Sequence, residues 1–257
     1  MIPTRVSDVV GRILPATAYN AARDIYYAPR TLWRSLAKAF HPSEEAVLRY
    51  WIAQRDHAAD VYFVQIGAHD GKTDDHLRPF VLQHGWKGVL VEPVPTLFGA
   101  LRRNYRDTPG LTFINAAIAD ADGHRSFWRC RDDAPAPMTP LSSFRRDVIA
   151  RHVRDVDAHF AEVLVPCLTV RSLLAQVSLP RLDLVMIDTE GYDYEILRQF
   201  LAPDLERWWP SLILYERRHL SREDRQAATE LLRQRGYLLQ PIGTGLNVAA
   251  TRRSRRV

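Results

Sequence analysis

The stretch from Val61 to Glu92 constrains the fold of this 257-residue chain more than any other. It begins with a mostly apolar run, rich in β-branched and aromatic residues, which predicts a buried strand over residues 61–66. A short turn bracketed by Gly67 and Gly71 follows. Because neither glycine carries a Cβ atom, the backbone can approach a ligand closely there. A helix and a second apolar strand, ending at Glu92, complete the unit and predict a parallel α/β sheet.

The position of Glu92 indicates what the turn binds. It lies about 20 residues beyond Gly71, the separation at which nucleotide-binding α/β folds place a carboxylate on the ribose hydroxyls. The residues between the glycines do not match the dinucleotide fingerprint G-x-G-x-x-G. A nucleoside ligand without a pyrophosphate therefore fits better, and S-adenosylmethionine is the cofactor we expect.

Composition argues against several classes of protein. The two cysteines, Cys130 and Cys167, lie far apart and have no C-x-x-C partner. This disfavours a zinc site and a disulfide scaffold, and it suits a reducing compartment. No apolar stretch approaches the ~18 residues of a transmembrane helix, and the N-terminus lacks a signal-peptide pattern. We therefore expect a cytoplasmic protein.

The formal net charge of +5 invites a nucleic-acid interpretation. Much of the basic excess, however, lies in the first 40 residues and in the C-terminal tail, residues 252–257, which contains four arginines. Such termini are usually solvated, and they predict no more than weak contact with an anionic membrane surface.

We predict three parts of the chain: an N-terminal helical arm or lid over residues 1–56, a domain over 57–251 and the basic tail. In the arm, Leu32, Leu36 and Phe40 are spaced four apart, as in an amphipathic helix. Within the domain, helices are expected over residues 73–83 and from Ser142 or Ser143, and strands over 125–130 and 163–170. Residues 237–240 and 246–250 are expected to close the sheet as an antiparallel pair.

Acidic residues follow three of the predicted strands: Glu92, Asp188 and Glu216. Ligands in such folds bind at the carboxyl ends of the strands. Asp188 and Glu190 flank one residue and precede Gly191, so they offer a catalytic base or two oxygen ligands for Mg²⁺. Glu216 could supply a third metal ligand or pair with a neighbouring arginine, and Asp188 could instead cap the following helix.

Five ordered motifs resemble the FkbM family of S-adenosylmethionine-dependent methyltransferases, over roughly residues 60–250. They are Val64-Gln65-Ile66-Gly67-Ala68-His69-Asp70-Gly71, Leu90-Val91-Glu92-Pro93, Asn115-Ala116-Ala117-Ile118-Ala119-Asp120, Leu168-Thr169-Val170-Arg171-Ser172-Leu173-Leu174 and Ile187-Asp188-Thr189-Glu190-Gly191. The resemblance implies a class I methyltransferase fold, which is Rossmann-like and doubly wound. It also implies O-methylation of a hydroxyl, often on a sugar or polyketide.

The candidate site follows from the motifs and the resemblance together. The expected cofactor contacts are Gln65, Gly67, Ala68, His69, Asp70, Gly71 and Glu92. Gln65 stands where many methyltransferases have an acid, but its amide oxygen can still accept a hydrogen bond from the methionine ammonium group. Asp188 and Glu190 are the expected catalytic pair. The candidate metal ligands are Asp188, Glu190 and Glu216.

Other functions remain open at this stage. A nucleic-acid methyltransferase usually has an aromatic platform after the fourth strand, whereas this chain has Asp188-Thr189-Glu190-Gly191, whose charge would repel phosphates. We therefore expect a small-molecule or glycan acceptor and no nucleic acid. A non-catalytic scaffold that binds S-adenosylmethionine and a dinucleotide oxidoreductase are the further alternatives.

Overall fold

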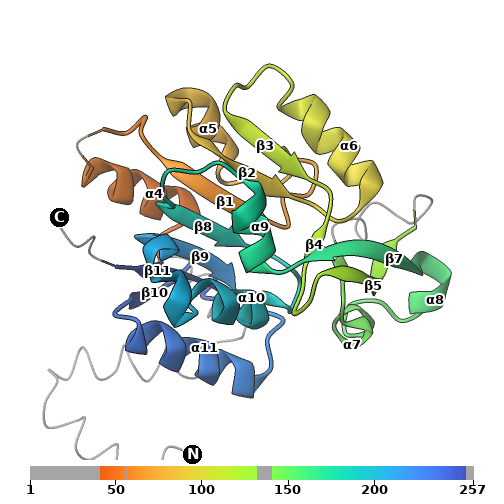
Figure 1. Ribbon diagram of the computed structural model, residues 1–257. Helices are drawn as coiled ribbons and strands as arrows, with labels where there is room; N and C mark the ends of the chain where they lie inside the picture. The colour runs from red at the N-terminus through yellow and green to blue at the C-terminus, as the bar shows by residue number, and fades with distance from the viewer. Residues whose placement is uncertain (1–40, 56, 132–140, 253–257) are drawn as a thin grey trace, which may run out of the picture. The chain divides into compact units, whose positions relative to one another are not determined.

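The structure is a computed structural model that describes residues 41–55, 57–131 and 141–252 (Figure 1). The described residues from Pro42 to Arg252 belong to one compact unit. The helix expected around Leu32–Phe40 and the basic tail beyond Arg252 lie outside the described residues.

A seven-stranded sheet organises this unit, in the order β10-β11-β9-β8-β1-β2-β3 (Figure 1). Its strands are β1 (Tyr62–Ile66), β2 (Lys87–Val91), β3 (Leu111–Ile114), β8 (Leu184–Ile187), β9 (Leu212–Glu216), β10 (Leu238–Ile242) and β11 (Asn247–Thr251). The first five are parallel to one another, and β11 runs antiparallel to both β9 and β10. This confirms the predicted doubly wound, mostly parallel sheet with an antiparallel C-terminal pair.

Successive side chains of each strand point to opposite faces of the sheet, and an apolar core lies on each face. In β1, Val64 and Ile66 belong to one core and Phe63 to the other, as the period of two in a strand requires. The first core takes side chains from α9 (Val170–Gln176), α10 (Asp193–Phe200) and α11 (Arg222–Gln234). The second takes them from α4 (Glu44–Ala53), α5 (Arg78–His84) and α6 (Pro95–Asn104). Helices therefore cover both faces.

Helix α4 packs within this domain, although we had placed its residues with the arm. Its Leu48 is fully buried. The Trp51 ring packs edge-on against Trp86, with ring centroids 6.3 Å apart, and the Trp51 indole nitrogen donates to the Ser211 hydroxyl at 3.3 Å. The second apolar core therefore starts upstream of residue 57.

A smaller second sheet has the order β4-β7-β5-β6. Its strands are β4 (Ala117–Ile118), β5 (Gly123–Cys130), β6 (Ser142–Ser143) and β7 (Phe160–Leu168), and the short helices α7 (Arg146–Ala150) and α8 (Val156–His159) lie between β6 and β7 in the chain. We predicted the strands over 125–130 and 163–170 but not a separate sheet. The helix predicted from Ser142 or Ser143 is wrong there, because these residues pair with Arg129 and Trp128 and the helix begins only at Arg146.

Helix α5 begins five residues later than the predicted start at Thr73. Asp70 Oδ1 accepts hydrogen bonds from the backbone N–H groups of Lys72 and Thr73, at 2.9 and 2.7 Å. Asp75 Oδ1 does the same for Leu77 and Arg78, at 3.0 and 3.2 Å. Such local side-chain bonds compete with helical hydrogen bonds, so they hold this segment as a turn.

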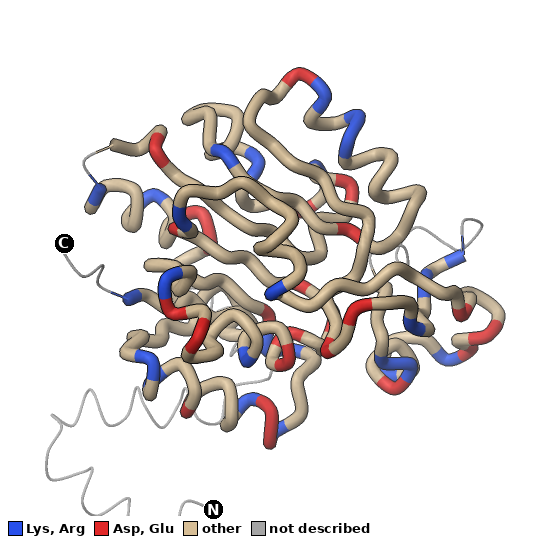
Figure 2. The backbone as a smooth tube through the Cα atoms, in the orientation of Figure 1, with Lys and Arg blue, Asp and Glu red and all other residues tan. Residues whose placement is uncertain are grey.

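Basic and acidic positions are interspersed along the described chain, as Figure 2 shows. Within the described ranges, no helix has both the length and the apolar character needed to cross a membrane.

Candidate functional site

A cavity of about 220 Å³ opens at the carboxyl ends of the central strands. Its lining includes residues from the turn after β1, from the end of β2 and from the loop after β8: Gln65, Gly67, Ala68, His69, Glu92, Asp188 and Glu190. Phe127 and Phe144 of the smaller sheet and its neighbouring loop also line it. The two sheets therefore share one cavity, which has acids on one wall and aromatic rings on another.

The turn after β1 is fixed by backbone contacts. The N–H groups of Gly67 and Ala68 both donate to the Val91 carbonyl at 3.0 Å. Gly67 has φ +80°, and a Cβ atom there would lie 1.8 Å from the backbone oxygen of Asp188. We had expected a side chain at Gly67 to meet the ligand, but the first obstacle is this carbonyl. Glycine is therefore required for the turn and the β8 loop to lie together.

Gln65 lines the cavity and carries an unpaired acceptor. Its amide nitrogen donates to Asp75 Oδ1 at 3.3 Å. Its Oε1 is buried and accepts no hydrogen bond from the described residues. A buried acceptor without a partner costs roughly 1–3 kcal/mol, so a ligand donor at this place, such as an ammonium group, would relieve that cost.

Glu92 is almost fully buried, with 4% of its surface exposed. Its Oε2 accepts from the His69 N–H and its Oε1 from the Val94 N–H, both at 2.9 Å. Burial raises the pKa of this carboxyl from 4.5 to about 7, and the two N–H donors partly oppose that rise. Each oxygen keeps a second lone pair, so the carboxylate can still accept from a pair of ligand hydroxyls.

Asp70 and Gly71 are not among the residues that line the cavity. Asp70 stabilises the turn through Lys72 and Thr73, as described above, and these bonds lower its pKa to about 2 against the opposing effect of burial. A Cβ atom on Gly71 would lie 2.4 Å from the Leu101 side chain. Both residues shape the turn, whereas His69 and Ala68 face the cavity.

Asp188 and Glu190 both line the cavity, and their loop is held at two points. The Asp188 N–H donates to the Ile66 carbonyl at 3.0 Å. The Ser143 hydroxyl donates to the Glu190 carbonyl at 2.8 Å, and Glu190 has a left-handed backbone, φ +54°. Although the Asp188 side chain is exposed to the cavity, the surrounding protein and the nearby Glu190 carboxylate raise its pKa.

The capping role considered for Asp188 is not found, because helix α10 has Tyr192 at its N-cap and no side-chain cap bond. Asp193, the first residue of that helix, instead holds the loop that precedes it. Its Oδ2 accepts from the Thr189 hydroxyl at 3.0 Å and from the Gly191 N–H at 3.3 Å. Asp188 itself makes no such bond in the described structure, so its carboxylate is available to a ligand.

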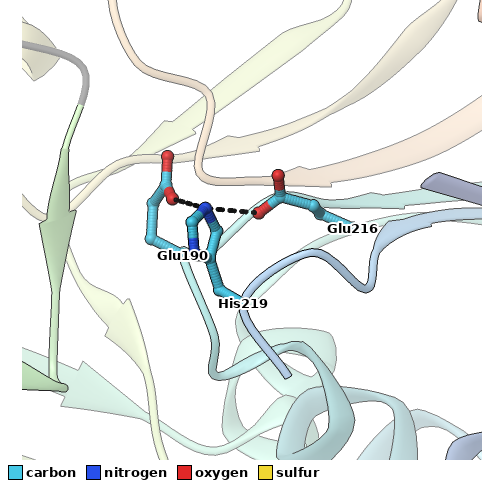
Figure 3. A group of neighbouring side chains, drawn as sticks. All are labelled: Glu190, Glu216 and His219. Atoms are coloured by element: carbon cyan, nitrogen blue, oxygen red, sulfur yellow. Dashed lines mark ion pairs between the residues drawn. The ribbon is translucent and has the colours of Figure 1, made fainter. Parts of the chain in front are cut away.

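Glu190 also contacts His219, which follows β9, and lies near Glu216 at the end of β9 (Figure 3). His219 Nε2 lies 3.0 Å from Glu190 Oε2 and 3.7 Å from Glu216 Oε2. One ligand atom from each of the three residues lies within 4.8 Å of the others. Of the predicted metal ligands, Glu190 and Glu216 belong to this group, but Asp188 does not. His219 was missed as a candidate ligand, although the Glu216-x-x-His219 spacing after a strand could have signalled it.

A sheet of this order with a cavity at its carboxyl edge has the class I, Rossmann-like fold of methyltransferases. The methyltransferase FkbM domain matches residues 65–239, more than half of the chain, so the protein belongs to that family. Membership implies S-adenosylmethionine as the methyl donor. No curated protein matches the chain.

Solved structures resemble this chain at low sequence identity. The crystal structure of methyltransferase FkbM from Methylobacillus flagellatus KT is 12% identical, with a TM-score of 0.52 over 83% of this chain and 48% of that one. Precorrin-6y C5,15-methyltransferase from Geobacter metallireducens GS-15 is 15% identical, with a TM-score of 0.40 over 81% and 87%. The N-terminal domain of human METTL16 is 12% identical, with a TM-score of 0.45 over 80% and 67%. The chain thus spans about half the length of the Methylobacillus protein.

Proposed function

We propose that the protein is an S-adenosylmethionine-dependent O-methyltransferase whose acceptor is a hydroxyl of a sugar, glycan or polyketide-like small molecule. One observation carries the proposal: Gln65, Glu92, Asp188 and Glu190 line the same cavity. A buried amide oxygen and a buried carboxylate suit the two polar ends of the cofactor. Two further acids suit an acceptor that must lose a proton.

We assign Gln65 Oε1, which accepts no hydrogen bond from the described residues, to the methionine ammonium group. We assign Glu92, whose oxygens each accept from one backbone N–H group, to the ribose hydroxyls. The turn at Gly67, Ala68 and His69 lies between them in the cavity wall. Asp70 and Gly71, which were also expected at the cofactor, stabilise that turn without lining the cavity.

Chemistry at the acceptor requires a base. The methyl group passes to the acceptor oxygen as the carbon–sulfur bond breaks, leaving S-adenosylhomocysteine, and the hydroxyl proton must go to the protein or to solvent. Asp188 is the favoured base because its raised pKa makes its carboxylate a stronger proton acceptor. Glu190 keeps that pKa high, and Mg²⁺ could replace direct proton transfer by polarising the oxygen.

A transfer assay tests this function. The full chain is incubated with S-adenosylmethionine labelled in the methyl group and with panels of sugars, glycans, polyketide alcohols and RNA oligonucleotides. We expect label on oxygen in a small-molecule or glycan panel. Calorimetry should show S-adenosylhomocysteine binding and no NAD binding. Label only on nucleobase nitrogen would refute the acceptor class, and cofactor binding without transfer to any panel would favour the scaffold alternative.

The variant Asp188→Asn tests the base. Removal of a positioned base typically lowers the rate ~10²–10⁴-fold, so turnover should fall by that factor while affinity for S-adenosylhomocysteine stays within a few-fold. Asp107→Asn is the matched control, because Asp107 is highly exposed and does not line the cavity. A wild-type turnover rate in Asp188→Asn would show that another residue is the base.

A further inference from the structure

Three side chains from the carboxyl ends of the neighbouring strands β8 and β9 converge (Figure 3). Glu190 comes from the loop after β8, Glu216 ends β9 and His219 follows three residues later. The His219 ring is 4% exposed, and the Glu190 and Glu216 side chains are 19% and 14% exposed. Glu190 also lines the cavity, so the group forms part of its wall.

The oxygens that face His219 are short of hydrogen-bond donors. Glu190 Oε2 and Glu216 Oε2 are both buried, and neither accepts a hydrogen bond from the described residues. The contact of each with the His219 ring is an ion pair only when that ring is protonated. Buried carboxylate oxygens normally have a hydrogen-bond donor or a cation as partner. Among the described side chains, only His219 is within ion-pair distance of these two oxygens, so a bound cation would complete their contacts.

Negative charge accumulates at this point of the fold. Glu216 is within electrostatic range of Asp188, Glu190 and Asp193, and Arg218 is the cation that opposes their repulsion. Asp193 is fully buried and is likewise within range of Asp188 and Glu190. Several acids thus share a low-dielectric region, where a divalent ion would offset their repulsion.

We propose that Glu190, Glu216 and His219 form a binding site for a divalent first-row transition-metal ion. Donor atoms ~2.0–2.2 Å from one ion lie roughly 3–4 Å from each other. His219 Nε2 meets that condition, at 3.0 and 3.7 Å from the two carboxylate oxygens, and all three donor atoms lie within 4.8 Å of one another. An imidazole ligand suits Zn²⁺, Mn²⁺ or Fe²⁺ better than Mg²⁺, which prefers oxygen ligands and keeps several waters. The site therefore differs from the candidate metal ligands of the sequence, Asp188, Glu190 and Glu216, and from the Mg²⁺ considered there.

The role of such an ion rests on the proposed function, whereas its binding does not. Glu190 places the ion at the cavity wall, where three protein ligands leave positions for an acceptor oxygen. An ion there would lower the pKa of a bound hydroxyl, which Asp188 could then deprotonate. The acceptor hydroxyl would have a second oxygen nearby if it chelates the ion, as vicinal diols and α-hydroxy acids do.

Metal binding by the full chain tests the proposal. After dialysis against EDTA and its removal, Zn²⁺, Mn²⁺ and Mg²⁺ are titrated separately by calorimetry. We expect Zn²⁺ and Mn²⁺ to bind at least ten-fold more tightly than Mg²⁺. Glu216→Gln and His219→Asn should each weaken the tight site by at least the ~10–100-fold that loss of a supporting contact causes. S-adenosylhomocysteine affinity, measured in parallel, reports separately on the cofactor site.

Matched variants control for adventitious binding, because the chain has nine histidines. Glu162→Gln and His124→Asn change exposed residues of the smaller sheet and should bind metal as the wild type does. The wild type should also gain thermal stability in Zn²⁺, whereas Glu216→Gln should gain less. If Glu216→Gln or His219→Asn fails to fold, Glu190→Gln is tested in its place.

Two outcomes would overturn the proposal. One is a wild-type chain that binds neither Zn²⁺ nor Mn²⁺ while still binding S-adenosylhomocysteine; the cluster would then be a Glu–His–Glu ion-pair group only. The other is unchanged metal affinity in folded Glu216→Gln and His219→Asn, which would place the bound ion elsewhere.

Discussion

Substitution of Gly67 by alanine tests why the turn after β1 needs glycine. A Cβ atom there would lie 1.8 Å from the Asp188 carbonyl oxygen, with the carbonyl carbon at 2.9 Å. Both atoms are backbone, and the Asp188 N–H is already bonded to the Ile66 carbonyl. The ends of β1 and β8 would therefore have to separate, and this would disturb both walls of the cavity.

The expected loss of stability has two parts. Alanine at φ +80° costs about 1–2 kcal/mol in backbone strain. The overlap adds the ~1–3 kcal/mol typical of overpacking, or more because backbone must move. A total of about 2–5 kcal/mol is a large part of the ~5–15 kcal/mol that stabilises an ordinary domain.

Gly236→Ala is the matched control, because Gly236 has φ +81° and nothing lies within 4 Å of its ideal Cβ position. Urea denaturation of both variants measures the free energy of unfolding, and calorimetry measures S-adenosylhomocysteine affinity. We expect Gly67→Ala to lose at least 1 kcal/mol more than Gly236→Ala, the lower end of the overpacking cost. Equal losses would refute the clash. Equal losses together with a selective fall in cofactor affinity would show instead that Gly67 admits the ligand.

Three further predictions concern buried groups in the site or in contact with it. Glu92→Gln should weaken S-adenosylhomocysteine binding by about 1.5–3 kcal/mol, the value of a charged hydrogen bond; unchanged affinity in calorimetry would remove Glu92 from the cofactor site. Because burial raises the pKa of Glu92 from 4.5 to about 7, its favourable contribution is complete below pH 4.5 and is lost as pH rises through 7. In urea denaturation of the cofactor-free protein, the free energy of unfolding of the wild type should therefore fall by up to about 3 kcal/mol relative to that of Glu92→Gln over that pH range. The same pH dependence of the free energy of unfolding in both proteins would contradict the assignment. Tyr105→Phe should lower the free energy of unfolding by about 1–3 kcal/mol, because the Tyr105 hydroxyl donates to Asp75 Oδ2 at 2.8 Å. A urea denaturation curve like that of the wild type would show that water replaces this donor.

The local patterns of the sequence were sufficient for the main sheet. Apolar strands that end at Ile66, Val91 and Ile187 lie where they were predicted, because burial on both faces leaves few alternatives for such runs. The antiparallel pair around Gly243 and Gly245 followed from turn chemistry. Periods and turns of this kind act over a few residues, so a single sequence contains them.

Features that depend on distant partners were not predictable in the same way. Ser143 resembles a helix cap in the sequence, but its hydroxyl donates to the Glu190 carbonyl, 47 residues away. Two short polar residues carry no periodicity that distinguishes an edge strand from a helix start. The smaller sheet, and with it the aromatic wall of the cavity, therefore needed the structure.

The acids at the ends of β8 and β9 show how the register between two strands brings separate motifs into one site. In the parallel pair β8–β9, Ile187 lies opposite Tyr215. The next residues along the two strands are Asp188 and Glu216, so the fold places these acids together although 27 residues of chain lie between them. Sequence spacing suggested that both acids lie at the same edge of the sheet, but not which side chain turns toward which. The left-handed backbone at Glu190 turns that residue toward His219 and away from a helical path. Asp188 is thereby left facing the cavity for the acceptor, while Glu190 lies between the cavity and the cluster, which makes it the residue through which metal binding and methyl transfer can influence each other.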